Sequence, residues 1–166
     1  MDTGPDAEAR LGQLARELAD GIDRAIAPWV ERSVQRVLEA WTAQAGRGQA
    51  PDPVVLATAA EAGRRARREI SPQIRDLLLT DVDHQRTTPL AILRTAVRYP
   101  TDVLRAAGVP PVARDPVARR QFPDDDYDLV PGSFGDLDPS LHDLGIAWGA
   151  AKAFVFTQRR RRGESA

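Results

Sequence analysis

The chain has 166 residues, of which 42% are hydrophobic and 5% aromatic, and its formal net charge is −1. A chain of this length fits one domain that buries about 70% of its extended surface, and a charge so near zero excludes steering of the whole molecule towards nucleic acid or membrane. The absence of cysteine excludes disulfides, thiolate metal sites and a cysteine nucleophile, and it suits a reducing compartment.

The composition predicts an all-α fold, because a core made mostly of Ala, Leu, Val and Ile favours closely approaching helices over a sheet. The N-terminal segment MDTGPDAEAR lacks the basic start and apolar run of a signal peptide. The longest apolar stretch, 144–156, contains Lys152 and falls short of the ~20 residues of a spanning helix. We therefore expect a cytoplasmic, single-domain helical bundle over 1–158 and a basic, disordered tail over 159–166.

The first predicted element is one long amphipathic helix over 6–44. Pro28 removes a backbone hydrogen bond from its interior, so we expect a kink or a break there. The apolar stripe is long enough to serve the chain's own core or a second copy in a homo-oligomer. Steps of three and four residues define it: Leu11, Leu14, Leu18, Ile22, Ile26, Trp29, Val30, Val34, Val37, Leu38 and Trp41.

Central helices are predicted over 52–107. A capping residue followed by proline marks a helix start, and the last of these starts opens a C-terminal helix over 139–160. The pattern occurs five times, at Asp52-Pro53, Ser71-Pro72, Thr88-Pro89, Asp115-Pro116 and Asp138-Pro139.

The helix that starts at Thr88 has an apolar arc too wide for a half-exposed position, so we expect other helices to surround it. Pro100 should end or bend it, and Gly108 should close the turns that follow. Residues 108–137 then form a loop rich in proline and aspartate. Its recurring apolar residues, including Tyr127, Leu129 and Leu137, predict an ordered loop pinned against the helices.

The C-terminal helix should bury Leu144, Trp148 and Val155 on one face. Small residues on it, among them Gly149 and Ala153, should let another helix approach closely. Lys152, the only lysine, could be a nucleophile with a lowered pKa, but a side chain that lies along apolar surface with its ammonium in water is the favoured interpretation.

Two kinds of charged segment could bind ligands. Asp124, Asp125 and Asp126 could hold Ca²⁺ or Mg²⁺, although the EF-hand spacing is missing and a solvated acidic loop is the simpler interpretation. The arginines could contact phosphates of nucleic acid or anionic lipid, form a solvated face, or pair with this acidic loop. They form two clusters: Arg64, Arg65, Arg67 and Arg68, and Arg159, Arg160, Arg161 and Arg162.

A metal site is the remaining candidate. Asp81, Asp83 and His84 offer carboxylate and imidazole ligands in one turn, and His142 with Asp143 is the other histidine–carboxylate pair. Helix capping and turn hydrogen bonds explain the same residues more simply, since the Glu-x-x-His signature of metal sites inside helical bundles is absent.

Three segments, AVRYPTDVLRAAGVPPVARD, FPDDDYDLVP and LGIAWGAAKAFV, resemble a group of small uncharacterised proteins of GC-rich Gram-positive bacteria. The resemblance covers roughly the C-terminal half of the chain and implies a cytoplasmic bacterial protein. No activity is attached to that group, so it implies no mechanism.

No glycine-rich phosphate loop, G-x-S-x-G elbow or H-E-x-x-H motif occurs, so we expect no cofactor. The leading hypothesis is a non-enzymatic helical protein that acts through contacts with a protein partner, as a regulatory or adaptor module. One alternative is a binder of nucleic acid or anionic membrane surfaces through the arginine clusters. Another is a metal-dependent enzyme at Asp83, His84 and His142.

Overall fold

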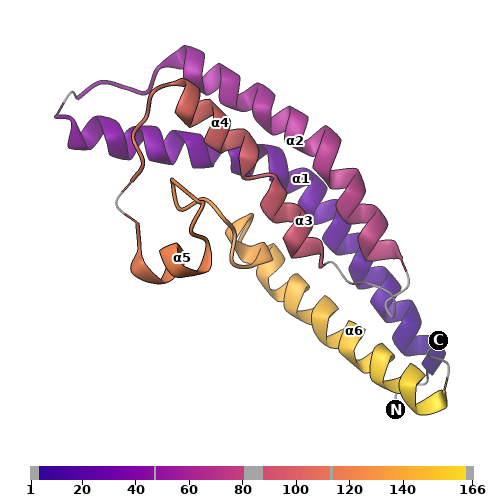
Figure 1. Cartoon of the computed structure of the whole chain (residues 1–166). Helices are drawn as coiled ribbons and strands as arrows, with labels where there is room; N and C mark the ends of the chain where they lie inside the picture. The colour runs from indigo at the N-terminus through magenta and orange to yellow at the C-terminus, as the bar shows by residue number, and fades with distance from the viewer. Residues whose placement is uncertain (1–3, 47, 81–87, 113, 164–166) are drawn as a thin grey trace.

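A computed structural model describes residues 4–46, 48–80, 88–112 and 114–163. Within these ranges the fold is all-α, as the composition predicts, and contains no strand. In Figure 1, α1 and α2 form a long antiparallel pair, α3 and α4 lie along α2, and α6 runs back along the N-terminal half of α1. The elements are α1 (Gly4–Gln44), α2 (Pro53–Leu79), α3 (Pro89–Thr95), α4 (Arg98–Ala106), α5 (Pro116–Gln121), the 3₁₀ turn η2 (Phe134–Asp136) and α6 (Leu141–Arg162).

The core is built around α1. Leu18, Ile22 and Ile26 on its stripe are fully buried, because α2, α4 and α6 all pack against this helix. The segment after Thr88 is therefore not the element that the others surround, and Leu90 and Ile92 in it remain half-buried. The stripe of α1 is used within the chain's own core.

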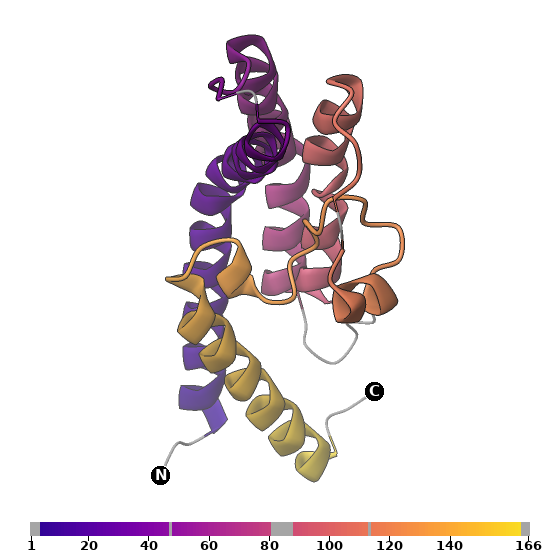
Figure 2. The same cartoon turned by 90° about the vertical axis from the view of Figure 1, so that its left-hand side faces the viewer.

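Pro28 does not interrupt α1. The helix continues through it and changes direction about midway along its length (Figures 1 and 2), so the expected kink is seen and the expected break is not. Pro28 is exposed, whereas Ile26 and Trp29 on either side of it are buried. Buried side chains on both sides hold the helix together across the missing hydrogen bond.

A narrow seam joins α1 to α2. Ala59, Gly63 and Ala66 are buried along it, and a Cβ atom added to Gly63 would stand 2.7 Å from the carbonyl oxygen of Ala27. The two backbones therefore approach each other more closely than any side chain at position 63 would allow.

The helix start predicted at Ser71-Pro72 is wrong, because α2 continues from Pro53 to Leu79. Ile70 and Ile74 on either side of this dipeptide are buried, so one continuous apolar face keeps the segment helical. The starts at Asp52, Thr88 and Asp115 are confirmed, since each side chain accepts a hydrogen bond from a backbone N–H of the first turn.

The break in the segment after Thr88 falls at Ala96–Val97, between α3 and α4. Pro100 lies in the first turn of α4, where a helix needs no N–H donor, so it does not end the helix. Gly108 closes α4 as predicted: its φ is +73°, and the N–H groups of Gly108 and Val109 donate to the carbonyls of Arg105 and Leu104.

The described part of the loop, 108–112 and 114–137, is held against the helices. Tyr127, Leu129 and Leu137 are buried, and the Tyr127 hydroxyl donates to the carbonyl of Val109 at 2.8 Å. Two arginines of the helices hold the loop's backbone, since Arg32 of α1 donates to the carbonyl of Leu137 at 2.9 Å and Arg94 of α3 donates to that of Pro131 at 3.2 Å.

The final helix begins at Leu141, two residues after its predicted start, because Asp138 and Pro139 form a turn before it in which Asp138 accepts from the N–H of Ser140. Its predicted inner face is confirmed, with Trp148 and Val155 buried and Leu144 half-buried. The ring of Phe134 meets that of Trp148 edge-on at 6.3 Å between centroids, which joins the loop to α6.

None of the helices formed by the described residues has both the length and the apolar character required to cross a membrane.

Candidate functional site

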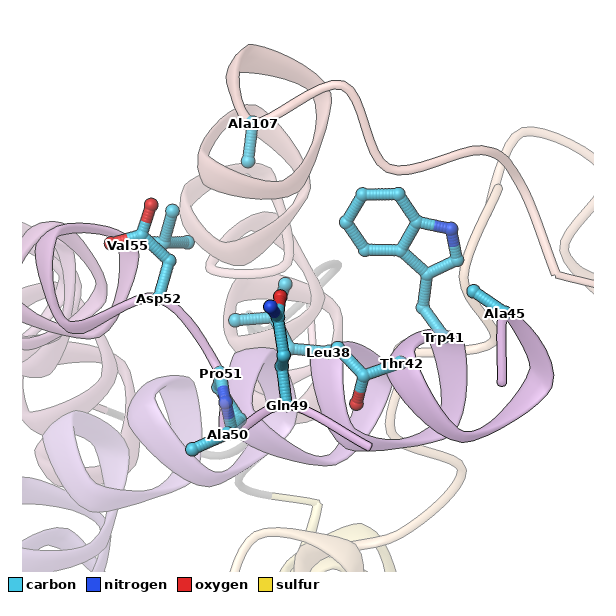
Figure 3. A pocket seen from close by; sticks show the side chains of 10 residues that line it. All are labelled: Leu38, Trp41, Thr42, Ala45, Gln49, Ala50, Pro51, Asp52, Val55 and Ala107. Carbon is cyan, nitrogen blue, oxygen red and sulfur yellow. The ribbon is translucent and has the colours of Figure 1, made fainter. Parts of the chain in front are cut away.

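A pocket of about 460 Å³ lies where the end of α1, the segment leading to α2 and the end of α4 meet. Figure 3 shows the ring of Trp41 forming one wall, with Val55 on the opposite side and Ala107 between them at the top of the view. We call it the Trp41 pocket. Its lining residues are Leu38, Trp41, Thr42, Ala45, Gln49, Ala50, Pro51, Asp52, Val55 and Ala107.

Local chain chemistry produces this pocket. Gly46 and Gly48 adopt φ values of +63° and +54°, which favour glycine and let the chain turn back after α1. Asp52 then caps α2, because its carboxylate accepts from the N–H of Val54 at 2.8 Å. The segment that connects α1 to α2 therefore lines the space between the two helix ends, and Trp41 beside this segment is only half-buried.

The pocket suits an apolar group better than a charged one. Its walls include Leu38, Trp41 and Val55, whereas the hydroxyl of Thr42 is already used in a hydrogen bond to the carbonyl of Glu39 at 3.0 Å. Asp52 is the one ionisable residue among the lining residues that the structure describes. The arrangement offers shape and apolar surface but no nucleophile or acid–base pair from these residues.

The arginines of the first cluster are all exposed on α2. Three of them, Arg64, Arg67 and Arg68, border a shallow hollow of about 500 Å³, which is also lined by Asp23, Ser71, Pro72 and Arg75. Their partners lie on α1 and α2, and the acidic loop contributes none of the pairs seen for them among the described residues. The pairs are Arg64–Glu61 at 2.7 Å, Arg68–Glu61 at 3.3 Å, Arg65–Glu69 at 2.8 Å and Arg67–Asp23 at 2.7 Å.

These pairs shift the pKa values of Asp23, Glu61 and Arg67. Hydrogen bonds from Arg67 hold the pKa of Asp23 below its ordinary value of 3.8, and those from Arg64 and Arg68 lower the pKa of Glu61. The pKa of Arg67 is raised by the same contact with Asp23. Neutralising partners thus surround the cluster, which is not a bare cationic surface.

One network extends from this cluster into the core. The hydroxyl of buried Tyr99 donates to Glu69, and the guanidinium groups of Arg65 and Arg98 lie 5.6 and 5.0 Å from the centroid of its ring. Contacts of this kind, cation over aromatic face, stabilise by about 0.5–2 kcal/mol. Arg65 and Glu69 therefore hold α4 against α2.

The second arginine cluster belongs to α6. Residues 159–162 are helical, so the disordered tail predicted over 159–166 is wrong for them; 164–166 lie outside the described residues. Arginine is a good helix former, and its charge is favourable in the last turn, which Gly163 caps with a φ of +70°. Arg159 pairs with Glu8 of α1 at 3.3 Å, while Arg160, Arg161 and Arg162 are exposed.

The aspartates of the loop act mainly as structural groups. Asp125 is buried and accepts from the N–H of Val130 at 2.7 Å, so the solvated-loop interpretation is wrong at this position. Asp126 pairs with Arg105 at 2.6 Å, and Asp128 pairs with Arg114 at 2.7 Å. Asp124 is exposed.

The metal-site residues Asp81, Asp83 and His84 lie outside the described residues. His142 is exposed on the first turn of α6. Within the ranges that the structure describes, no group of three or more His, Cys, Asp or Glu side chains is placed to hold a metal ion.

Lys152 lies along apolar surface, as the favoured interpretation predicts, but its ammonium contacts an aromatic ring. It is half-buried on α6, and its ammonium lies 5.2 Å from the centroid of the Trp148 ring. Burial lowers its pKa. A cation held on an aromatic face one turn away explains its position without a catalytic role.

The Trp41 pocket is the feature that the sequence did not predict. Trp41 lies at the end of the apolar stripe, directly before a loop with two glycines, and an aromatic residue at such a helix end is a signal for an incompletely covered core. Whether a neighbouring element fills the space depends on where α4 ends, which no local pattern defines.

Comparisons with known proteins find no match to a family model, to a curated protein or to a solved structure. The resemblance of the C-terminal half to proteins of GC-rich Gram-positive bacteria therefore stays a prediction.

Proposed function

We propose that this chain is a non-enzymatic helical binding protein of the cytoplasm, a regulatory or adaptor module that takes an apolar side chain of a protein partner into the Trp41 pocket. The observation that carries the proposal is the combination of an open, Trp-walled pocket of about 460 Å³ and a strongly exposed apolar residue next in sequence to one that lines it. Val54, adjacent to the lining residue Val55, is 71% exposed.

Interface energetics support a protein partner. Aromatic residues in a pocket surrounded by polar groups are typical of the few positions that dominate binding. Here Trp41 supplies the aromatic wall, and Thr42 and Gln49 supply polar groups at the rim. A partner helix or extended segment would insert one apolar anchor and cover Val54 at the same time.

The arginine clusters give weaker support to the alternative, a binder of nucleic acid or anionic membrane surfaces. Each arginine of the first cluster faces a carboxylate of its own chain, and a phosphate would have to displace it. The second cluster keeps three exposed arginines, Arg160 to Arg162. Three cations neutralise few phosphates and release few counterions, so they contribute little affinity for nucleic acid.

The test is a selection of displayed random peptides on the immobilised protein. We expect enriched sequences to share an apolar anchor and to lose binding to the Ala45→Arg variant, because Ala45 lines the pocket and is exposed, so arginine fills the pocket without disturbing the core. The Ala40→Arg variant is the matched control, since Ala40 is exposed on α1, near its C-terminal end but outside the pocket lining.

No enrichment of a common anchor, or equal binding to both arginine variants, would contradict the proposal.

A further inference from the structure

Helix α6 has a second apolar face that the described part of the chain leaves exposed. Ile146 is 59% exposed and Phe154 is 46% exposed. A Cβ atom added to Gly149 on the same side would meet nothing within 4 Å. This face lies opposite the buried residues Trp148 and Val155, because 3.6 residues per turn place both of them on the other side of α6 from Ile146.

The exposed face carries a regular repeat. Alternating steps of three and four residues are the spacing of a two-helix seam, and this one is about 25 Å long at 1.5 Å per residue. The positions, which we call the α6 seam, are all exposed: Asp143, Ile146, Ala150, Ala153, Thr157 and Arg160.

The two ends of the α6 seam have opposite charges, with Asp143 at the start and Arg160 at the end. We propose that a second copy of this chain docks on the α6 seam with its own α6 antiparallel, so that Asp143 pairs with Arg160 of the partner subunit. A two-fold axis forms each such contact twice. A parallel arrangement would instead place like charges together at both ends, which is unfavourable.

The same register brings complementary shapes together. At the centre, Ala150 faces Ala153 of the partner subunit, and these small residues let the helices approach closely. Further out, Ile146 covers Thr157 of the partner subunit. A hollow of about 250 Å³ beside the seam is placed for Phe154 of the partner subunit, and its lining is Ala7, Arg10, Ala147, Ala150, Ala151 and Phe154.

This self-association is separate from the proposed function. The Trp41 pocket lies at the C-terminal end of α1, whereas α6 packs along the N-terminal half of that helix (Figures 1 and 2). A dimer formed through the α6 seam leaves the pocket open, so either proposal can fail without the other.

Sedimentation equilibrium of the full chain from about 1 µM to about 1 mM, a range that covers weak to moderate dimers, tests the proposal. We expect a concentration-dependent dimer that Ile146→Glu abolishes and that Val117→Glu leaves intact, because Val117 is 60% exposed on α5, away from the seam. A monomer throughout, or a dimer that Ile146→Glu does not weaken, would overturn it.

Charge reversal tests the direction of pairing. Asp143→Arg or Arg160→Asp alone should weaken the dimer about tenfold, because each change replaces two attractive contacts per dimer with repulsive ones. The double variant should recover most of the loss. A double variant as weak as the single variants would contradict the antiparallel register.

Cross-linking adds a direct measure of register, since the chain has no cysteine of its own. A mixture of Ala150→Cys and Ala153→Cys chains should form a disulfide between the two variants under mild oxidation. A mixture of Ala150→Cys and Thr157→Cys chains should not, because these two positions would be four residues, or about 6 Å along the helix axis, out of register. The reverse result would overturn the proposed pairing.

Discussion

Helices α1 and α6 lie side by side and antiparallel, yet they use their apolar residues differently. Helix α1 has one apolar stripe, and nearly all of it is buried against α2, α4 and α6. Helix α6 has apolar residues on almost every side, and one face, with Ile146 and Phe154, remains exposed.

The difference shows how hydrophobic patterning relates to assembly. A stripe on one side of a helix needs one set of neighbours, and a chain of this size can supply it. A helix that is apolar all round needs neighbours on all sides, and here α1 and η2 cover one side of α6. Its exposed face is therefore the expected place for an intermolecular contact.

The largest expected effect is on the core of α1. Ile26→Ala should lower the free energy of unfolding by about 2–5 kcal/mol, because Ile26 is fully buried and its truncation leaves a cavity. Ile146→Ala, the same change on the exposed face of α6, should change it by no more than about 0.5 kcal/mol at low protein concentration. Urea unfolding of both variants measures the contrast, and equal losses would refute it.

Two glycines sharpen the comparison. Gly63→Ala should destabilise by about 1–3 kcal/mol, because the new methyl group would force α2 away from the backbone of Ala27. Gly149→Ala, in the open part of α6, should stabilise by about 0.5–1 kcal/mol through helix propensity. Thermal unfolding should therefore shift in opposite directions, and a shift of the same sign would contradict the assigned packing.

The smallest effect is the pH dependence of the pair between Arg67 and Asp23. Because the folded pKa of Asp23 lies below its ordinary value of 3.8, the pair's contribution is complete above that pH and is lost as the pH falls through the folded pKa.

Asp23→Asn should therefore lower stability near neutral pH by a constant, modest amount and flatten the loss of stability below pH 4. Asp124→Asn, at an exposed position in the loop, is the control. Urea unfolding from pH 7 to pH 2 gives the measurement. If Asp23→Asn lost as much stability between pH 4 and pH 2 as the wild-type chain does, the pair would be excluded as a contributor.

Local chemistry made part of the fold predictable. The caps at Asp52, Thr88 and Asp115 need only a few neighbouring residues, and so does the left-handed stop at Gly108. The dipeptide Ser71-Pro72 has the same local pattern but lies inside α2, because burial on both sides of it overrides the local signal.

Contacts between residues far apart in the sequence could not be predicted for the candidate sites. Arg64 with Glu61 and Arg65 with Glu69 lie three and four residues apart, so their spacing indicates them. Arg67 with Asp23 depends on how α2 lies along α1. The Trp41 pocket likewise depends on where separate helices end.

The most direct test of the central claim uses single cysteines in this cysteine-free chain. Ile22 is fully buried on α1, whereas Ile146 is 59% exposed on α6. In dilute, native conditions the Ile146→Cys thiol should react with a thiol reagent at the rate of a free thiol. The Ile22→Cys thiol should react at least about 10³-fold more slowly than the Ile146→Cys thiol, because its exposure requires unfolding that costs about 5 kcal/mol or more. Similar rates for the two thiols would contradict the account.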